Sequence, residues 1–212
     1  MARLRLALLA LVLILAALAA ALYVALRPDR SSATAAIPVD SAAAATWPAG
    51  ARRAPVFALR DEDGKPVALR ALRGATTIVT FVDPLCRDFC PTEVRRLGDA
   101  VRRADPSAAI VAVSTNVYGN DRAALKQDER KWNVVPRWHW AVGSRLELER
   151  VWHQYGVQVI ETKKTVAGVT THEISHTLAA YVVGPDGSER ALLLWPFTAR
   201  AAADALRAVT AS

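Results

Sequence analysis

The sequence predicts an α/β fold with a mixed β-sheet, preceded by one membrane-spanning helix. Three observations support this expectation. Segments with the periods of strands and helices alternate through residues 55–212. The only two cysteines, Cys86 and Cys90, stand where a strand-like run gives way to a helix-like run. Near the start of the chain, Leu6 to Leu26 contains no charged residue.

The apolar run from Leu6 to Leu26 is long enough to cross a bilayer. At about 1.5 Å per residue, a helix over this run measures roughly 31 Å, close to the hydrocarbon thickness. A cleaved signal peptide has a shorter apolar core, and a mitochondrial transit peptide is amphipathic, so both alternatives fit less well. Arg3 and Arg5 favour the cytoplasmic side. We therefore expect a single-pass anchor in the cell membrane over residues 1–29, with the rest of the chain on the extracytoplasmic side.

Residues 30–54 are rich in Ala, Ser and Pro and show little periodicity, which predicts a tether between anchor and domain. The net charge of +7 suggests nucleic acid at first sight. However, residues 1–54 contain six arginines and two aspartates, which account for four of these seven charges. The domain over residues 55–212 carries the remaining +3. Because it also lacks a basic stripe with interleaved aromatic residues, nucleic-acid binding is excluded.

The first half of the domain begins with a hairpin. Val56–Leu59 and Pro66–Leu69 read as its strands, with a turn at Asp61–Gly64. Thr76–Val82 is rich in β-branched residues and reads as a buried strand. Pro91–Ala104 follows as a helix, with proline at its first position and apolar residues recurring every three or four positions.

The middle of the domain continues the alternation. Ala108–Ser114 reads as a second buried strand, and Asp121–Trp132 as a helix capped by its first residue. Trp138–Val142 is expected to form a short strand. The next helix runs from its cap Ser144 to Tyr155, and Glu147 completes a capping box.

The last part of the chain predicts a strand pair and a final helix. The two strands are expected over Thr177–Val183 and Glu189–Trp195, joined by a turn at Gly184–Gly187. The final helix is expected over Thr198–Val209. The cysteine pair thus follows the first long strand and precedes its helix. That arrangement is typical of a thioredoxin-like sandwich with a mixed sheet.

Cys86 and Cys90 can form a structural disulfide, a redox dithiol or a two-thiolate site for a soft metal. We expect Cys90 at the N-cap of the helix, where free amides and the helix dipole lower the pKa of its thiol, with Arg87 adding a nearby positive charge. A purely structural disulfide fits an oxidising compartment, but so short a loop would constrain the unfolded chain little. The three intervening residues also differ from the two of an ordinary thioredoxin active site. A redox or metal function is therefore favoured.

A soft metal would need a third ligand, for which four histidines are available. His139 and His153 lie in tryptophan-rich stretches and are expected to be packing residues. His176 stands where a loop enters the strand at 177–183, whose start can reach the cysteine loop. On position alone, a packing role for His176 also stays open.

The segment from His172 to His176 matches the zinc-peptidase pattern H-E-x-x-H, with Glu173 in the place of the general base. That chemistry requires a helix, so that both imidazoles share one face. The preceding Val169-Thr-Thr and the following strand pair disfavour a helix. A zinc peptidase is therefore the least favoured alternative.

At several positions the chain resembles the Sco/SenC family of membrane-anchored, thioredoxin-like copper chaperones. The stretch Cys86-Arg-Asp-Phe-Cys90-Pro91 resembles the family motif C-P-D-x-C-P, with Arg87 in place of the proline. Ser175-His176-Thr177 is similar to the family's D-H-S-like context, and Val183–Gly187 to its closing turn. The likeness spans about residues 55–195. Departures at Pro84 and over Ser114–Asp121 identify a divergent member.

The resemblance implies a copper site formed by Cys86, Cys90 and His176. Two thiolates and an imidazole suit the soft ion Cu(I), with Cu(II) as an alternative state. The implied partners are the copper-bearing subunit of a respiratory cytochrome oxidase, whose binuclear copper centre would be assembled, and a thiol reductant. The protein would then be a metallochaperone and not an enzyme. Two alternatives remain: a thiol–disulfide reductase acting through Cys86 and Cys90, and a membrane-tethered binding module with an inert disulfide.

Overall fold

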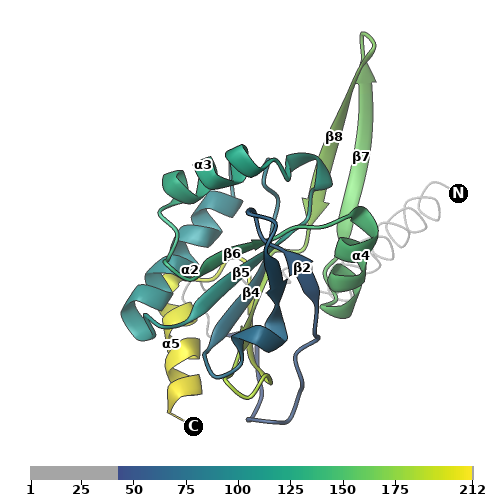
Figure 1. Ribbon diagram of the computed structural model, residues 1–212. Helices are drawn as coiled ribbons and strands as arrows, with labels where there is room; N and C mark the ends of the chain where they lie inside the picture. Colours follow the sequence, from purple (N-terminus) through teal and green to yellow (C-terminus); the bar gives the residue numbers. More distant parts are fainter. Residues whose placement is uncertain (1–42, 212) are drawn as a thin grey trace, which may run out of the picture. The chain divides into compact units, whose positions relative to one another are not determined.

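A six-stranded mixed sheet forms the centre of the domain in the computed structural model, which describes residues 43–211 (Figure 1). The strand order is β1-β10-β9-β4-β5-β6. Its strands are β1 (Ala45–Thr46), β4 (Thr77–Val82), β5 (Ala109–Ser114), β6 (Trp138–Ala141), β9 (Ala179–Val183) and β10 (Glu189–Leu194). Strands β4, β5 and β6 are parallel, whereas β9 and β10 are antiparallel to their neighbours. The predicted mixed sheet is confirmed.

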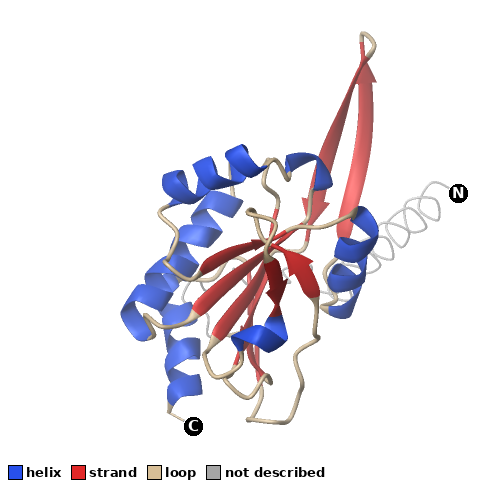
Figure 2. Ribbon diagram, viewed as in Figure 1, coloured by secondary structure: helices blue, strands red, loops and turns tan. Residues whose placement is uncertain are grey.

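Helices cover both faces of this sheet (Figure 2). They are α2 (Cys90–Ala104), α3 (Arg122–Trp132), α4 (Arg145–Gln154) and α5 (Ala199–Thr210), with short 3-10 turns η1 (Leu69–Leu72) and η2 (Val117–Gly119). Successive strand residues alternate between two cores. Ile78 and Ile110 pack in the core with α2, α3 and α5, whereas Val79 and Val111 pack in the core with α4. Because both faces are covered, β4 and β5 are buried along their whole length.

The local signals for helix starts are confirmed. The Asp121 carboxylate accepts a hydrogen bond from the backbone amide of Ala124 at 2.9 Å, and Ser144 and Glu147 form the predicted capping box. The hairpin near residue 60 is also present, as β2 (Ala58–Arg60) and β3 (Pro66–Ala68). Element boundaries differ from the predicted ones by up to a few residues, since the last turns and strand ends depend on tertiary contacts.

A second hairpin, β7 (Val159–Val166) and β8 (Val169–His176), was not predicted. The expectation that a loop precedes His176 is wrong, because His176 is the last residue of β8. Within the described part of the chain, the two strands pair only with each other, and they extend away from the six-stranded sheet (Figure 1). Most of their side chains are exposed. The sequence therefore lacks the alternation of apolar and polar residues that marks a strand with one buried face.

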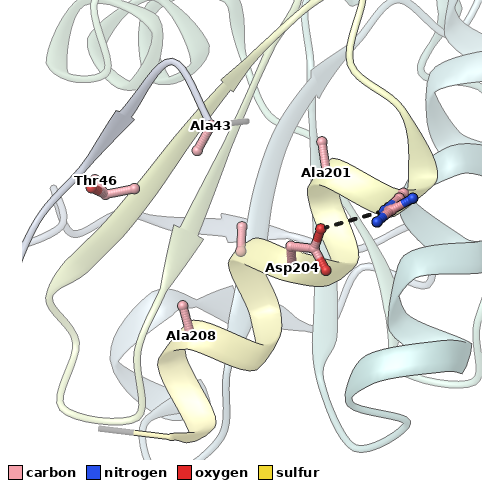
Figure 3. A pocket seen from close by; sticks show the side chains of 7 residues that line it. Ala43, Thr46, Ala201, Asp204 and Ala208 are labelled. Carbon is pink, nitrogen blue, oxygen red and sulfur yellow. Dashed lines mark ion pairs between the residues drawn. The ribbon is translucent and has the colours of Figure 1, made fainter. Parts of the chain in front are cut away.

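The end of the predicted tether is attached to the sheet. Backbone amides of Ala44 and Trp47 donate to β10, and β1 pairs with the same strand. A shallow groove of about 350 Å³ lies between this segment and α5 (Figure 3). Alanine side chains line much of the groove, beside an ion pair between Arg200 and Asp204.

The predicted anchor over residues 1–29, including the run from Leu6 to Leu26, lies outside the described residues. Within residues 43–211, no helix combines the length and apolar character needed to cross a bilayer.

Candidate metal and dithiol site

The topology brings Cys86, Cys90 and His176 together. Strand β4 ends at Val82, and the following loop carries Cys86 to the first turn of α2, which begins at Cys90. Strand β9 lies antiparallel beside β4, so its start is next to the end of β4, and His176 precedes that start. The Cys90 Sγ lies 3.8 Å from the His176 Nε2, although 86 positions separate the two residues. All three side chains line one pocket of about 580 Å³.

The separation of Cys90 and His176 suits a bridging ion. Metal–sulfur and metal–nitrogen bonds of about 2.3 and 2.0 Å, at an open angle, place the two donor atoms roughly 3.5–3.8 Å apart. Within the described part of the chain, no three His, Cys, Asp or Glu side chains already surround one metal position.

The hydrogen bond of His176 orients its imidazole. Nδ1 lies 3.1 Å from the carbonyl oxygen of Thr177, which can only accept, so Nδ1 carries the proton in this contact. Burial lowers the pKa of His176, which favours the neutral ring. The Nε2 lone pair is then free and faces Cys90, as a metal ligand requires.

The two cysteines are free thiols whose acidities differ in the direction opposite to the prediction. The hydrogen bond from the Cys90 side chain, supported by backbone amides of Cys90, Asp88 and Phe89, lowers the pKa of Cys86 to about 5. The pKa of Cys90 is raised, chiefly because its thiol donates to Cys86 and because it is buried. The expected thiolate at Cys90 is therefore wrong. Phe89 occupies the N-cap, and the amides at the start of α2 converge on the Cys86 sulfur instead.

Arg87 also acts differently from the prediction. Its guanidinium turns toward α3 and donates to the buried carboxylate of Asp128 at 3.1 Å. The same nitrogen donates to the carbonyl oxygens of Pro84 and Cys86 at 3.0 and 3.3 Å. Arg87 therefore ties the cysteine loop to α3, and it is not among the groups that lower the pKa of Cys86.

Glu93 is a buried acid that does not line the pocket but interacts electrostatically with the cysteines, and the sequence reasoning missed it. It lies one turn into α2, is fully buried, and accepts a hydrogen bond from the Thr80 hydroxyl at 2.7 Å. Burial raises its pKa to about 8, and the negative charge of Cys86 adds to this shift. Its other carboxyl oxygen has no hydrogen-bond partner among residues 43–211. The signal was present in the sequence, because Glu93 falls on the core-facing side of α2, one residue before buried Val94.

Apolar side chains line part of the mouth of the pocket. Phe89, between the two cysteines, is 56% exposed and packs edge-on against Trp195. Leu85 is 48% exposed, and Ile174 and Leu178 line the opposite side. Asp83, Arg87 and Asp88 line the same pocket, so the sulfurs and the imidazole are reached through a rim that is apolar only in part.

The remaining histidines lie elsewhere. His139 is half-buried in β6 and His153 is exposed on α4, and neither lines the pocket. His172 and His176 share a strand instead of a helix, which separates them by about 13 Å along β8. The H-E-x-x-H pattern consequently does not form a zinc-peptidase site.

A mixed α/β domain with a dithiol at the start of the helix after a central strand defines a thioredoxin-like protein. The histidine opposite the sulfurs adds a possible third donor. The SCO1/SenC family model matches residues 47–211, and the chain belongs to this family.

Known relatives agree with this assignment. The mouse "Protein SCO2 homolog, mitochondrial" is 26% identical over 136 residues, which is 62% of this chain and 52% of the relative. The match thus covers about half the length of that protein.

Two solved structures show the same fold. The crystal structure of Arabidopsis thaliana ScoI, solved with copper bound, has a TM-score of 0.65 at 20% identity, covering 74% of this chain and 97% of that one. BsSco, described as having a disulfide switch and as a member of the Sco family of cytochrome c oxidase assembly proteins, has a TM-score of 0.57 at 20% identity, covering 76% of this chain and 92% of that one.

Proposed function

We propose that this protein is a copper-binding chaperone that delivers copper for assembly of the binuclear copper centre of a respiratory oxidase. The observation that carries the proposal is the approach of His176 Nε2 to within 3.8 Å of Cys90 Sγ, in a pocket that Cys86 also lines. Two sulfurs and a neutral imidazole form a donor set that prefers Cu(I).

The site combines binding with accessibility. Three ligands suit Cu(I) and leave room for a donor from a recipient protein, whereas a closed four-ligand cage would retain the ion. The pocket of about 580 Å³ is much larger than one ion needs, so a recipient side chain can enter. Copper bound in Arabidopsis ScoI and the oxidase-assembly role stated for the family of BsSco support copper and a copper-bearing oxidase subunit as cargo and partner.

The redox state of the dithiol would control binding. Copper needs both sulfurs reduced and deprotonated, so oxidation of Cys86 and Cys90 to a disulfide removes two of the three ligands. Cys86 already favours the thiolate, whereas Cys90 has to release its proton to water or buffer when the metal binds its sulfur. A thiol reductant is therefore part of the proposal.

We also propose that the domain is held at the cell membrane on the extracytoplasmic side, through residues 6–26. The uncharged run from Leu6 to Leu26 and the arginines before it support this placement. Membrane tethering would keep the chaperone near a membrane-bound oxidase. Fractionation of the expressed chain, with protease added to intact cells or spheroplasts, tests both the anchor and its orientation.

Metal stoichiometry tests the central proposal. The reduced protein should bind one Cu(I) per chain, and the oxidised protein none. His176→Ala should weaken Cu(I) binding without unfolding the domain, whereas His153→Ala, at an exposed histidine on α4, should leave it unchanged. Equal Cu(I) affinities of the wild type and His176→Ala would remove this histidine from the site.

A second candidate function is a thiol–disulfide reductase that keeps the cysteines of the target reduced. The lowered pKa of the half-buried Cys86 favours it, because a thiolate is the attacking form in disulfide exchange. This function predicts copper-free reduction of a disulfide substrate that survives His176→Ala. Turnover needs both cysteines, because one sulfur forms a mixed disulfide with the substrate and the other resolves it. A mixed disulfide that accumulates in Cys90→Ser but not in Cys86→Ser would assign Cys86 as the attacking sulfur.

A further inference from the structure

The hairpin β7–β8 carries His176 but has few connections to the rest of the domain. It is a separate two-stranded sheet, and His176 at its base pairs with Val159. The amide of Thr177 donates to the carbonyl of Gln158, a bond that joins the two ends of the hairpin to each other. The position of the imidazole therefore depends on how the hairpin is held against the domain.

Four side chains hold it at one place. Glu161 of β7 accepts hydrogen bonds from the Arg145 guanidinium at 2.7 Å and from the Tyr118 hydroxyl at 3.1 Å. His172 Nδ1 of β8 lies 2.6 Å from the same carboxylate, and its ring packs on Tyr118 with centroids 4.2 Å apart. We call these four residues the hairpin clamp.

The clamp joins the hairpin to two elements of the domain. Tyr118 belongs to η2, and Arg145 is the first residue of α4. Glu161 and His172 are largely covered, with side chains 17% and 27% exposed, on a hairpin that is otherwise mostly exposed. The contacts thus concentrate at the part of the hairpin nearest the domain.

The clamp and His176 lie on the same face of the hairpin. His172 and His176 are four residues apart in β8, so their side chains point to the same side. Glu161 pairs with Ile174, between these two histidines, and therefore shares that face. A tilt of the hairpin that breaks the clamp would also displace the His176 ring relative to Cys90.

We propose that the clamp formed by Tyr118, Arg145, Glu161 and His172 positions His176 for metal binding, and that His172 is a positioning residue and not a ligand. This inference rests on the proposed copper function. It assigns a role to the first histidine of the H-E-x-x-H pattern. Outer contacts that orient a metal ligand typically change metal affinity by about 10- to 100-fold when removed.

Glu161→Ala is the test variant, because Glu161 contacts the other three members of the clamp. Glu173→Ala is the matched control. It removes a glutamate from the same hairpin, where Glu173 pairs with Lys164 at 2.7 Å outside the clamp. We expect Glu161→Ala to weaken Cu(I) binding on the order of tenfold, and Glu173→Ala to leave it unchanged.

A double-mutant cycle shows whether the effect passes through His176. In a His176→Ala background, Glu161→Ala should cause no further loss of Cu(I) affinity. An equal loss with and without His176 would overturn the inference, because the clamp would then act on the dithiol or on the fold as a whole. Unchanged Cu(I) affinity in Glu161→Ala alone would overturn it as well.

Hydrogen exchange of the complete, metal-free chain provides a readout independent of copper. Amides of residues 170–176 should exchange faster in Glu161→Ala than in Glu173→Ala, while β4 and α2 keep wild-type protection. Equal exchange in the two variants would overturn the clamp. Failure of the wild type to bind Cu(I) would instead refute the proposed copper function, and the exchange comparison would still decide whether the clamp holds the hairpin.

Discussion

The unequal acidity of the two cysteines leads to a direct experiment. The pKa of Cys86 falls from 9.0 to about 5, because its sulfur accepts hydrogen bonds from the Cys90 thiol and from three backbone amides. At pH 7 this corresponds to about 99% thiolate, compared with about 1% at a pKa of 9. Cys90, by contrast, stays a thiol, since its ionisation would break the bond to Cys86 and place a second negative charge beside the first.

Alkylation of the reduced, metal-free protein measures this difference. The iodoacetamide rate should rise with pH through an inflection near 5, and peptide mapping should find the first adduct on Cys86. Thiolate absorbance at 240 nm should follow the same curve. Cys90→Ala removes the strongest hydrogen-bond donor to the Cys86 sulfur but leaves the backbone amides, so its inflection should lie above that of the wild type and below 9. An inflection near 9, or a first adduct on Cys90, would refute the assignment.

Two further predictions concern groups around the site. Glu93 stays protonated in the folded protein up to a pKa of about 8, whereas it ionises near 4.5 when unfolded, so its contribution to stability is lost as pH rises between these values. Urea unfolding should therefore show Glu93→Gln gaining on the wild type by up to about 1.4 kcal/mol per pH unit in this window; a constant difference would show that Glu93 is already ionised. Arg87→Ala should cost about 1–3 kcal/mol, because the 4% exposed carboxylate of Asp128 loses its partner. Adding Asp128→Asn should restore part of that loss, and equal urea midpoints for the wild type, the single variant and the double variant would show the ion pair to be inert.

The predictable parts of the fold are those whose signals are local or buried. Ser144 and Glu147 form a cap within four residues, so their sequence alone indicates the start of α4. The β-branched run of β4 has to be strand because both of its faces are covered. The hairpin β7–β8 lacks both kinds of signal. Residues such as Lys164 and Thr171 are exposed, and no apolar face marks the strands.

The chemistry of the cysteine pair shows a second limit. The sequence places Cys90 at the start of a helix and Cys86 in the loop before it, and α2 does begin at Cys90. Which sulfur receives the amide hydrogen bonds depends on how the loop from Asp83 to Phe89 folds back. The N-cap is Phe89 and not Cys90, and this shift of one residue lets the amide of Cys90 donate to the Cys86 sulfur. Glu93 shows the same limit. Its position on α2 can be predicted from the sequence, whereas its hydrogen bond with the buried Thr80 cannot.

The three candidate ligands also have supports of unequal rigidity. Cys90 is 1% exposed on a helix packed into the main core, whereas Cys86 is half-buried in a loop tied to α3 by Arg87. His176 depends on a hairpin that pairs with no other strand that the structure describes. The apolar residues of α2 predict the helix on which Cys90 lies, and their packing in the core also holds Cys90 in place. The candidate ligand that was hardest to place from sequence, His176, lies on a hairpin that is held by side-chain contacts between distant segments. Such contacts can be broken without unfolding the sheet.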